Sequence, residues 1–141
     1  MVVGVFDGTN TVLQVYTQDA SGQYVRSGTN PLASVGTYIG LQYINPVFGD
    51  VNGDNLADLV VGSDNGEIRV ALRNEDGSFG AATLITTIAE INTAPRPAIN
   101  DVDGDGDGDL LVSIGGDTTE AQALLLFVNN GNGTYTRQAA P

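Results

Sequence analysis

Residues 46–61 read Pro46-Val47-Phe48-Gly49-Asp50-Val51-Asn52-Gly53-Asp54-Asn55-Leu56-Ala57-Asp58-Leu59-Val60-Val61, and the same pattern returns 51 residues later, from Pro97 to Val112. The second occurrence has at its centre the stretch Asp101-Val102-Asp103-Gly104-Asp105-Gly106-Asp107-Gly108-Asp109. Self-similarity at a fixed period of about fifty residues is the sequence signature of a repeat architecture, in which each repeat is one supersecondary unit. The chain is therefore expected to consist of stacked repeats.

A second shared pattern follows each copy and also occurs near the start of the chain. Apolar residues occur at every second position, and a short link follows that has Asp or Asn first and Gly fourth. The alternating residues are Leu13 and Val15, then Ile68, Val70 and Leu72, then Leu124, Leu126 and Val128. The links are Asp19 to Gly22, Asn74 to Gly77 and Asn130 to Gly133. Alternation indicates strands with one buried face, and the links suit a type I turn closed by a residue at positive φ.

Each full repeat should contain four strands. Val47-Phe48 and Ala98-Ile99 fit an inner strand before the Asp-rich stretch, and a second short strand follows it in both copies. Four short antiparallel strands in about fifty residues are typical of a β-propeller blade. The sequence thus predicts an all-β fold of four-stranded antiparallel propeller blades, about three in number, the first of them incomplete. The predicted units are a partial blade at 1–35 that lacks an inner strand and an Asp-rich loop, a blade at 36–90 with loop 50–58, and a blade at 91–141 with loop 101–109.

Composition excludes several kinds of chemistry. Lys and Arg total 5 against 17 Asp and Glu, and the net charge of −12 removes the electrostatic basis for nucleic-acid binding. The absence of His and Cys excludes Ser-His-Asp and Cys-His catalysis, as well as zinc sites built on imidazole or thiolate.

No apolar run approaches the roughly 18 residues needed to cross a bilayer, so no membrane insertion is expected. Residues 1–7 lack the pattern of a signal peptide, so an export signal is expected to have been removed or to lie outside this sequence.

The two Asp-rich loops carry oxygen-bearing side chains at positions 1, 3, 5 and 9, counted from the first Asp of each. Alternate positions of a tightly coiled loop can direct side chains to one centre, and calcium takes six to eight oxygen ligands at about 2.3 to 2.6 Å. Position 7 would contribute its backbone carbonyl because Leu56 has no side-chain oxygen, which leaves the Asp107 carboxylate without a predicted role. Positions 4 and 6 hold Gly or Asn, which tolerate the left-handed conformation of a sharp turn. We predict two Ca²⁺ sites with the ligands Asp50, Asn52, Asp54, Leu56 and Asp58 in one loop and Asp101, Asp103, Asp105, Asp107 and Asp109 in the other.

Solvated acidic turns are the plainer interpretation of these loops, since most charge runs are exposed. However, two carboxylates about 4 Å apart repel by roughly 4 kcal/mol at an effective dielectric constant near 20, so three converging carboxylates without a cation would oppose folding. Magnesium is disfavoured because it retains its water ligands. An EF-hand requires a bidentate Glu at position 12, where this sequence has Val61 and Val112.

The loops closely resemble the Asp-x-Asp-x-Asp-Gly-x-x-Asp loop of FG-GAP and VCBS repeats, the calcium-bearing blades of integrin α-subunit propellers and of many secreted bacterial proteins. The resemblance is strong over 46–79 and 97–135 and weak over 2–24. It implies that the loop joins the inner strand to the second strand, and that calcium braces this turn without taking part in chemistry. Of the integrin-type Phe-Gly and Gly-Ala-Pro signature only Phe48-Gly49 is present, which favours the bacterial branch.

We therefore expect a non-catalytic, calcium-binding β-propeller module for extracellular or cell-surface adhesion or recognition, with a protein or glycan as ligand. Extracellular calcium modules have dissociation constants of about 0.1 to 1 mM, which suits that compartment. One alternative is an architectural fragment that self-assembles into a closed propeller, and another is a polysaccharide-active enzyme. Eight of the 17 acidic residues lie in the two loops, so no enzyme is expected. The end blades should be covered by self-association, most simply as a dimer, or by flanking blades of a longer chain.

Overall fold

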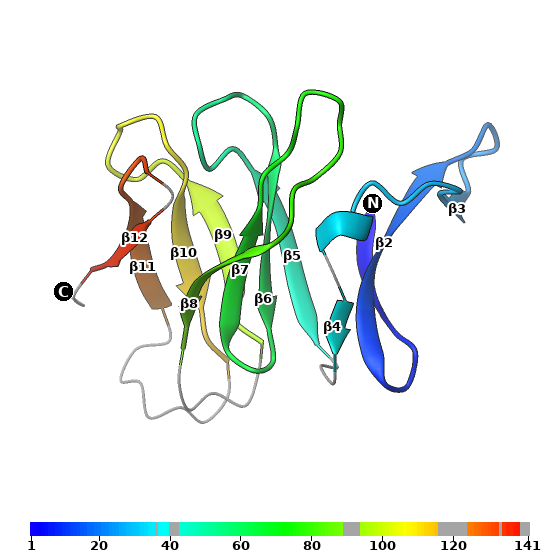
Figure 1. Ribbon diagram of the computed structural model, residues 1–141, viewed down its shortest axis with the longest axis horizontal. Helices are drawn as coiled ribbons and strands as arrows, with labels where there is room; N and C mark the ends of the chain where they lie inside the picture. The colour runs from blue at the N-terminus through cyan, green and yellow to red at the C-terminus, as the bar shows by residue number, and fades with distance from the viewer. Residues whose placement is uncertain (36, 40–42, 89–93, 116–123, 133, 139–141) are drawn as a thin grey trace.

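The computed structural model describes residues 1–35, 37–39, 43–88, 94–115, 124–132 and 134–138. These residues form three antiparallel β-sheets that stand side by side (Figure 1). The first sheet contains β1 (Val2–Phe6), β2 (Asn10–Gln18), β3 (Tyr24–Arg26) and β4 (Thr37–Ile39). The second contains β5 (Ile44–Gly49), β6 (Asp58–Ser63), β7 (Glu67–Ala71) and β8 (Thr83–Thr87), and the third contains β9 (Arg96–Asn100), β10 (Asp109–Ser113), β11 (Leu124–Asn129) and β12 (Tyr135–Arg137). The predicted all-β fold of propeller-type blades is confirmed.

Within the described ranges the one helical element is the short 3-10 helix η1 (Ala33–Val35), and no helix there is long and apolar enough to span a membrane. The second and third sheets have the same order, β5-β6-β7-β8 and β9-β10-β11-β12, so that each is a simple antiparallel meander. The Asp-rich stretches join β5 to β6 and β9 to β10. Both therefore emerge at the same end of the molecule, at the top of Figure 1.

The predicted hairpin turns form where the structure describes them. Gly22 donates its backbone N–H to the carbonyl of Asp19 at 3.0 Å, and Gly77 donates to that of Asn74 at 2.9 Å. Both glycines have positive φ, 82° and 84°, as the sequence requires of the fourth turn residue. In the third hairpin Gly133 lies outside the described residues.

The first sheet departs from the predicted unit boundary after residue 35. Strand β4 pairs with Asn10 to Val12 of β2, so the first sheet extends to Ile39. Leu32, just before η1, and Val35, the last residue of η1, are buried in the layer between the first two sheets. Their burial brings the chain back to the edge of β2. Among the described residues this sheet has no counterpart of β5 or β9, and β1 pairs with β2 alone. The predicted boundary between residues 90 and 91 lies outside the described residues.

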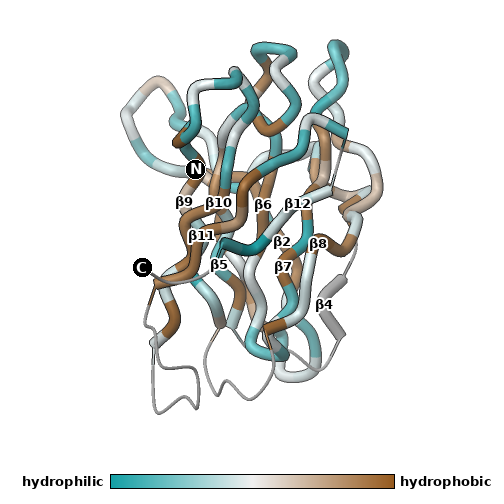
Figure 2. The backbone as a smooth tube through the Cα atoms, turned by 90° about the vertical axis from the view of Figure 1, so that its left-hand side faces the viewer, coloured by the Kyte–Doolittle hydropathy of each residue, from teal (hydrophilic) through white to brown (hydrophobic). Residues whose placement is uncertain are grey.

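Two hydrophobic layers hold the three sheets together. The layer between the first and second sheets contains Leu13, Leu32, Val35, Leu59, Val61, Ala71 and Phe79. The layer between the second and third sheets contains Val51, Val60, Ile68, Ile88, Leu110, Val112, Ile114, Leu125 and Phe127. Figure 2 shows the same division, with hydrophobic residues along the strands and hydrophilic ones in the loops at the upper end.

The central sheet is covered on both faces, whereas the third is covered on one. Successive residues of a strand point to opposite faces, so Leu59 and Val61 of β6 enter one layer and Val60 enters the other. In β10 the equivalent run has Leu110 and Val112 buried, but Leu111 between them is 38% exposed. The apolar run in β10 therefore belongs to a sheet whose second face is open.

Candidate metal centre

The two Asp-rich loops fold in the same way around their first aspartate. Asp50 accepts the backbone N–H of Gly53 on Oδ1 at 2.8 Å and that of Asn55 on Oδ2 at 2.6 Å. In the second loop Asp101 accepts from Gly104 at 2.6 Å and from Gly106 at 3.1 Å. The carboxylate at position 1 thus binds the N–H groups of positions 4 and 6 in both loops.

Positions 4 and 6 have the backbone conformation that the sequence predicted. Their φ angles are 74° at Gly53, 84° at Gly104, 65° at Asn55 and 97° at Gly106. Asn55 is the one non-glycine residue with positive φ in the described part of the chain, and a short polar side chain makes this conformation accessible. The left-handed residues allow each loop to coil back on its first carboxylate.

The aspartate at position 9 anchors each loop to its sheet. Asp58 and Asp109 are both fully buried. Asp58 accepts the backbone N–H of Val51 at 3.0 Å and that of Arg73 at 2.7 Å. Asp109 accepts from Val102 at 2.7 Å and from Asn129 at 2.8 Å. Each of these carboxylates therefore joins the start of its loop to the end of the third strand of its sheet.

Three carboxylates converge in the second loop. Oxygen atoms of Asp101, Asp103 and Asp109, at positions 1, 3 and 9, lie within 4.8 Å of one another. Two ligands of one calcium ion at about 2.3 to 2.6 Å can be at most about 5 Å apart, so this spacing fits a shared cation. Asp101 and Asp103 are exposed and Asp109 is buried, which leaves the group open to solvent on one side.

One aspartate in each loop is harder to ionise than an isolated carboxyl group. Loss of hydration raises the pKa of Asp103, and the negative charges of Asp105, Asp109 and Asp101 raise it further. In the first loop burial raises the pKa of Asp58, and the charges of Asp54 and Asp50 add to this effect. A bound cation would reverse both effects because it favours the charged carboxylates.

The structure brings the other predicted ligands together less closely. Asp105 lies outside the group of three and accepts the N–H of Asp107 at 2.9 Å, as Asp54 accepts that of Leu56 at 2.8 Å. Among the described residues, the carboxylates of Asp50, Asp54 and Asp58 do not form a comparable group. Asn52 instead donates from Nδ2 to Asp54 at 2.9 Å.

The comparisons with known proteins bear on these same loops. Residues 50–112 match the family described as the FG-GAP-like repeat. The chain contains an FG-GAP-like repeat. The matched span begins at the first aspartate of one loop and ends just beyond the other loop, in β10, so the FG-GAP-like region includes all ten predicted ligands. No curated protein matches the chain.

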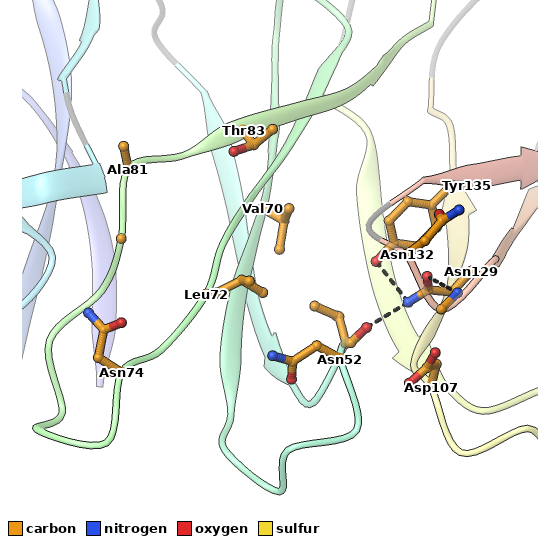
Figure 3. A pocket seen from close by; sticks show the side chains of 13 residues that line it. Asn52, Val70, Leu72, Asn74, Ala81, Thr83, Asp107, Asn129, Asn132 and Tyr135 are labelled. Carbon is orange, nitrogen blue, oxygen red and sulfur yellow. Dashed lines mark hydrogen bonds between the residues drawn. The ribbon is translucent and has the colours of Figure 1, made fainter.

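A cleft of about 590 Å³ lies beside the loops of the FG-GAP-like region, between the second and third sheets (Figure 3). Its lining includes Val51, Asn52, Asp107, Asn129 and Tyr135. Burial raises the pKa of Tyr135 to about 12, and the negative charges of Asp58, Asp109 and Asp107 contribute. The phenol of Tyr135 therefore stays protonated at neutral pH.

Sequence reasoning missed Asn129 at this cleft and assigned no role to the carboxylate of Asp107. Asn129 is buried, and its Nδ2 donates to the carbonyl of Val51 at 2.6 Å, 78 residues earlier in the chain. The carboxylate of Asp107 lies between two glycines, because β-carbons placed at Gly53 and Gly131 would be 3.0 Å and 2.9 Å from its oxygens. The contacts of Asn129 with Val51 and of Asp107 with Gly53 have no signal within one repeat, since both depend on the loop of the neighbouring sheet.

Proposed function

We propose that this chain is a calcium-stabilised, non-catalytic blade module in which Ca²⁺ braces the two Asp-rich loops. The observation that carries the proposal is the convergence of Asp101, Asp103 and Asp109 within 4.8 Å of one another. The FG-GAP-like repeat over residues 50–112 supports it independently. The donors are all oxygens, which suits a hard cation such as calcium.

The proposed second site uses Asp101, Asp103, Asp105 and Asp109, with the carbonyl of Asp107. The proposed first site uses the equivalent atoms of Asp50, Asn52, Asp54, Leu56 and Asp58. Calcium at these sites would supply the positive charge that the loops lack. Because Asp109 also binds the backbone of β11, calcium at the second site would stabilise the loop and the sheet together.

Calorimetric unfolding with calcium and with a chelator tests this proposal. At free calcium one hundred times the dissociation constant, each independent site adds about 2.7 kcal/mol to the free energy of unfolding if the unfolded chain binds negligibly. We expect the melting temperature to rise with calcium and to fall with EGTA, and magnesium at equal concentration should have a smaller effect. A melting temperature that does not respond to calcium would contradict the proposal.

A location outside the cell, with adhesion or recognition of a protein or glycan as the role, forms the second part of the proposal. The net charge of −12 and the lack of His and Cys support a binding module over an enzyme. Calcium modules of low affinity are filled where free calcium is in the millimolar range. A screen of the calcium-loaded protein against glycans and extracellular matrix proteins tests this role, and loss of binding in EGTA is the expected control result.

An architectural role is favoured by one specific observation. The open face of the third sheet carries Leu111, which is 38% exposed, and Leu124, which is 54% exposed. Their equivalents in the second sheet are Val60 and Ile68, which are fully buried in the layer facing the third sheet. The third sheet thus presents the kind of surface that binds a further blade, and we propose that a second copy of the chain covers it.

A further inference from the structure

The two buried aspartates of the separate loops are connected by a short chain of hydrogen bonds. Val51 follows the first loop's first ligand, donates its N–H to Asp58 at 3.0 Å and accepts the side chain of Asn129 on its carbonyl at 2.6 Å. Asn129 in turn donates its backbone N–H to Asp109 of the second loop at 2.8 Å. All four residues are buried, so water does not compete freely for these bonds.

The side-chain amide of Asn129 both donates and accepts hydrogen bonds, which Figure 3 draws as dashed lines. Its Nδ2 also lies 3.3 Å from the carbonyl of Gly108, next to the anchoring aspartate of the second loop. Its Oδ1 accepts the N–H of Gly131 at 3.2 Å. A displacement of either loop would therefore break bonds that hold the other loop.

The loops also touch directly. A β-carbon at Gly108 would collide with the backbone carbonyl of Asp50, so the backbones of the two loops are in contact there. The carboxylate of Asp107 in the second loop lies against Gly53 in the first. Three contacts at residues 50, 51 and 53 thus join the first loop to the third sheet.

The repeat itself provides an internal comparison for Asn129. The equivalent position in the second sheet is Arg73, whose backbone N–H makes the same bond to Asp58, at 2.7 Å, as Asn129 makes to Asp109. Arg73 faces the first sheet, where the described residues contain no Asp-rich loop, and its side chain is exposed. Asparagine occurs at the position whose neighbour is a loop with a carbonyl to bind.

We propose that Asn129 is a positioning residue that couples the two loops, so that calcium bound in one raises the calcium affinity of the other. This inference rests on the proposed calcium sites. Calcium in the second loop fixes Asp109 and, through Asn129, the carbonyl of Val51 in the first. Because coupling between sites is reciprocal, calcium in the first loop strengthens the second by the same factor. Allosteric couplings in proteins are typically about 5- to 150-fold, and we expect at least about fivefold here.

Calcium titration of single-site variants measures this factor. Asp54→Ala disables the first loop and Asp103→Ala the second, and calcium binding to the remaining loop is followed by calorimetry and by the NMR amide signals of Gly53 and Gly104. In the wild-type chain the product of the two stepwise binding constants should exceed the product of the single-site constants by about fivefold or more. Equal products would overturn the coupling.

The role of Asn129 is tested by repeating the comparison with Asn129→Ala, and with Asn129→Ser should the alanine variant not fold. Coupling should disappear while each loop still binds calcium singly. Arg73→Ala is the matched control, because it removes the side chain at the equivalent position and should retain the coupling. Coupling that persists without the Asn129 amide would overturn its assignment. Absence of calcium binding in the wild-type chain would instead refute the calcium sites themselves.

Discussion

The two loops differ in charge at positions 3 and 7, and at position 3 the second loop has Asp103. The first loop has Asn52 there, and the pKa of Asp103 is raised by loss of hydration and by three neighbouring aspartates. Asn52 instead donates a hydrogen bond to Asp54, which relieves the same repulsion without a cation. Calcium affinity in such loops depends on the number of charged ligands, so the second loop should bind calcium more tightly than the first.

A reciprocal exchange at position 3 tests this difference. Asp103→Asn should lower the affinity of the second loop by about tenfold or more, which corresponds to about 1.4 kcal/mol of binding free energy. The same variant should raise the melting temperature of the calcium-free protein, because one repelling charge is removed. Asn52→Asp should have the opposite two effects, and calorimetric titration of both variants measures them. If calcium affinity changed in the same direction in both variants, the assignment of position 3 as a ligand would be contradicted.

Gly108 is the residue at which backbone contact between the loops excludes a side chain. A β-carbon there would collide with the carbonyl of Asp50 and lie 2.7 Å from Ile99. Gly108→Ala should therefore lower the free energy of unfolding by about 1 to 3 kcal/mol, the usual range for overpacking. Gly28→Ala is the control, since no atom lies within 4 Å of its β-carbon position, and it should be close to neutral. Denaturant unfolding of the two variants provides the measurement.

At the scale of the element, strands of similar sequence have different burial because of their neighbours. Strand β6 lies in the central sheet and all its residues are buried, whereas β10 lies in the third sheet and exposes Leu111. Adjacent residues of β10 point to opposite faces, so they report separately on the covered and the open face. A comparison of Leu110 with Leu111 therefore measures how much inter-sheet packing contributes to stability.

Leucine-to-alanine substitutions on the two faces of β10 test this reading. Leu110 is fully buried in the layer between the second and third sheets, and Leu110→Ala should cost about 2 to 5 kcal/mol of stability. Leu111→Ala, measured at low protein concentration, should cost less than about 1 kcal/mol because much of this side chain already contacts solvent. Chemical denaturation compares the pair. Similar losses would show that the open face is covered in solution even at low concentration.

At the scale of the whole molecule, three sheets form an arc with two uncovered faces. The open face of the third sheet carries Ala98, Leu111, Leu124 and Leu126, and the outer face of the first carries Val3, Val5, Val12 and Tyr16. Closed propellers contain about four to eight blades, each packed against two neighbours. Because the sheets are repeats, each of these two faces corresponds to a face of the second sheet that is covered within the chain. The open face of the third sheet can therefore pack on the outer face of the first sheet of a second copy.

Analytical ultracentrifugation tests this assembly. We expect the chain to associate at micromolar concentration, most simply as a dimer, and Leu124→Arg on the open face should shift the equilibrium to monomer by introducing an unpaired charge into the interface. Thr17→Arg, at an exposed position of β2, serves as a control that should leave association unchanged. A wild-type chain that remains monomeric and folded at these concentrations would refute the self-association.

Short-range patterns in the amino-acid sequence were enough to predict the local features of this protein. Alternating apolar residues specified the strands, the fixed order of Asp and Gly specified the hairpin turns, and the left-handed residues Gly53, Asn55, Gly104 and Gly106 specified the coiling of both loops. These features depend on interactions within a few residues, so they can be inferred from spacing alone. The four-stranded repeat and the choice of candidate ligands followed from the same local pattern.

Which side chains come into contact became known from the folded chain. It gathered Asp101, Asp103 and Asp109 but left Asp105 outside the group, and it continued the first sheet through β4 beyond the predicted boundary. It also placed Asn129 against the carbonyl of Val51, a contact between residues 78 positions apart. The contact between Asn129 and Val51 depends on how neighbouring sheets pack, and one repeat considered alone contains no information about the repeat beside it.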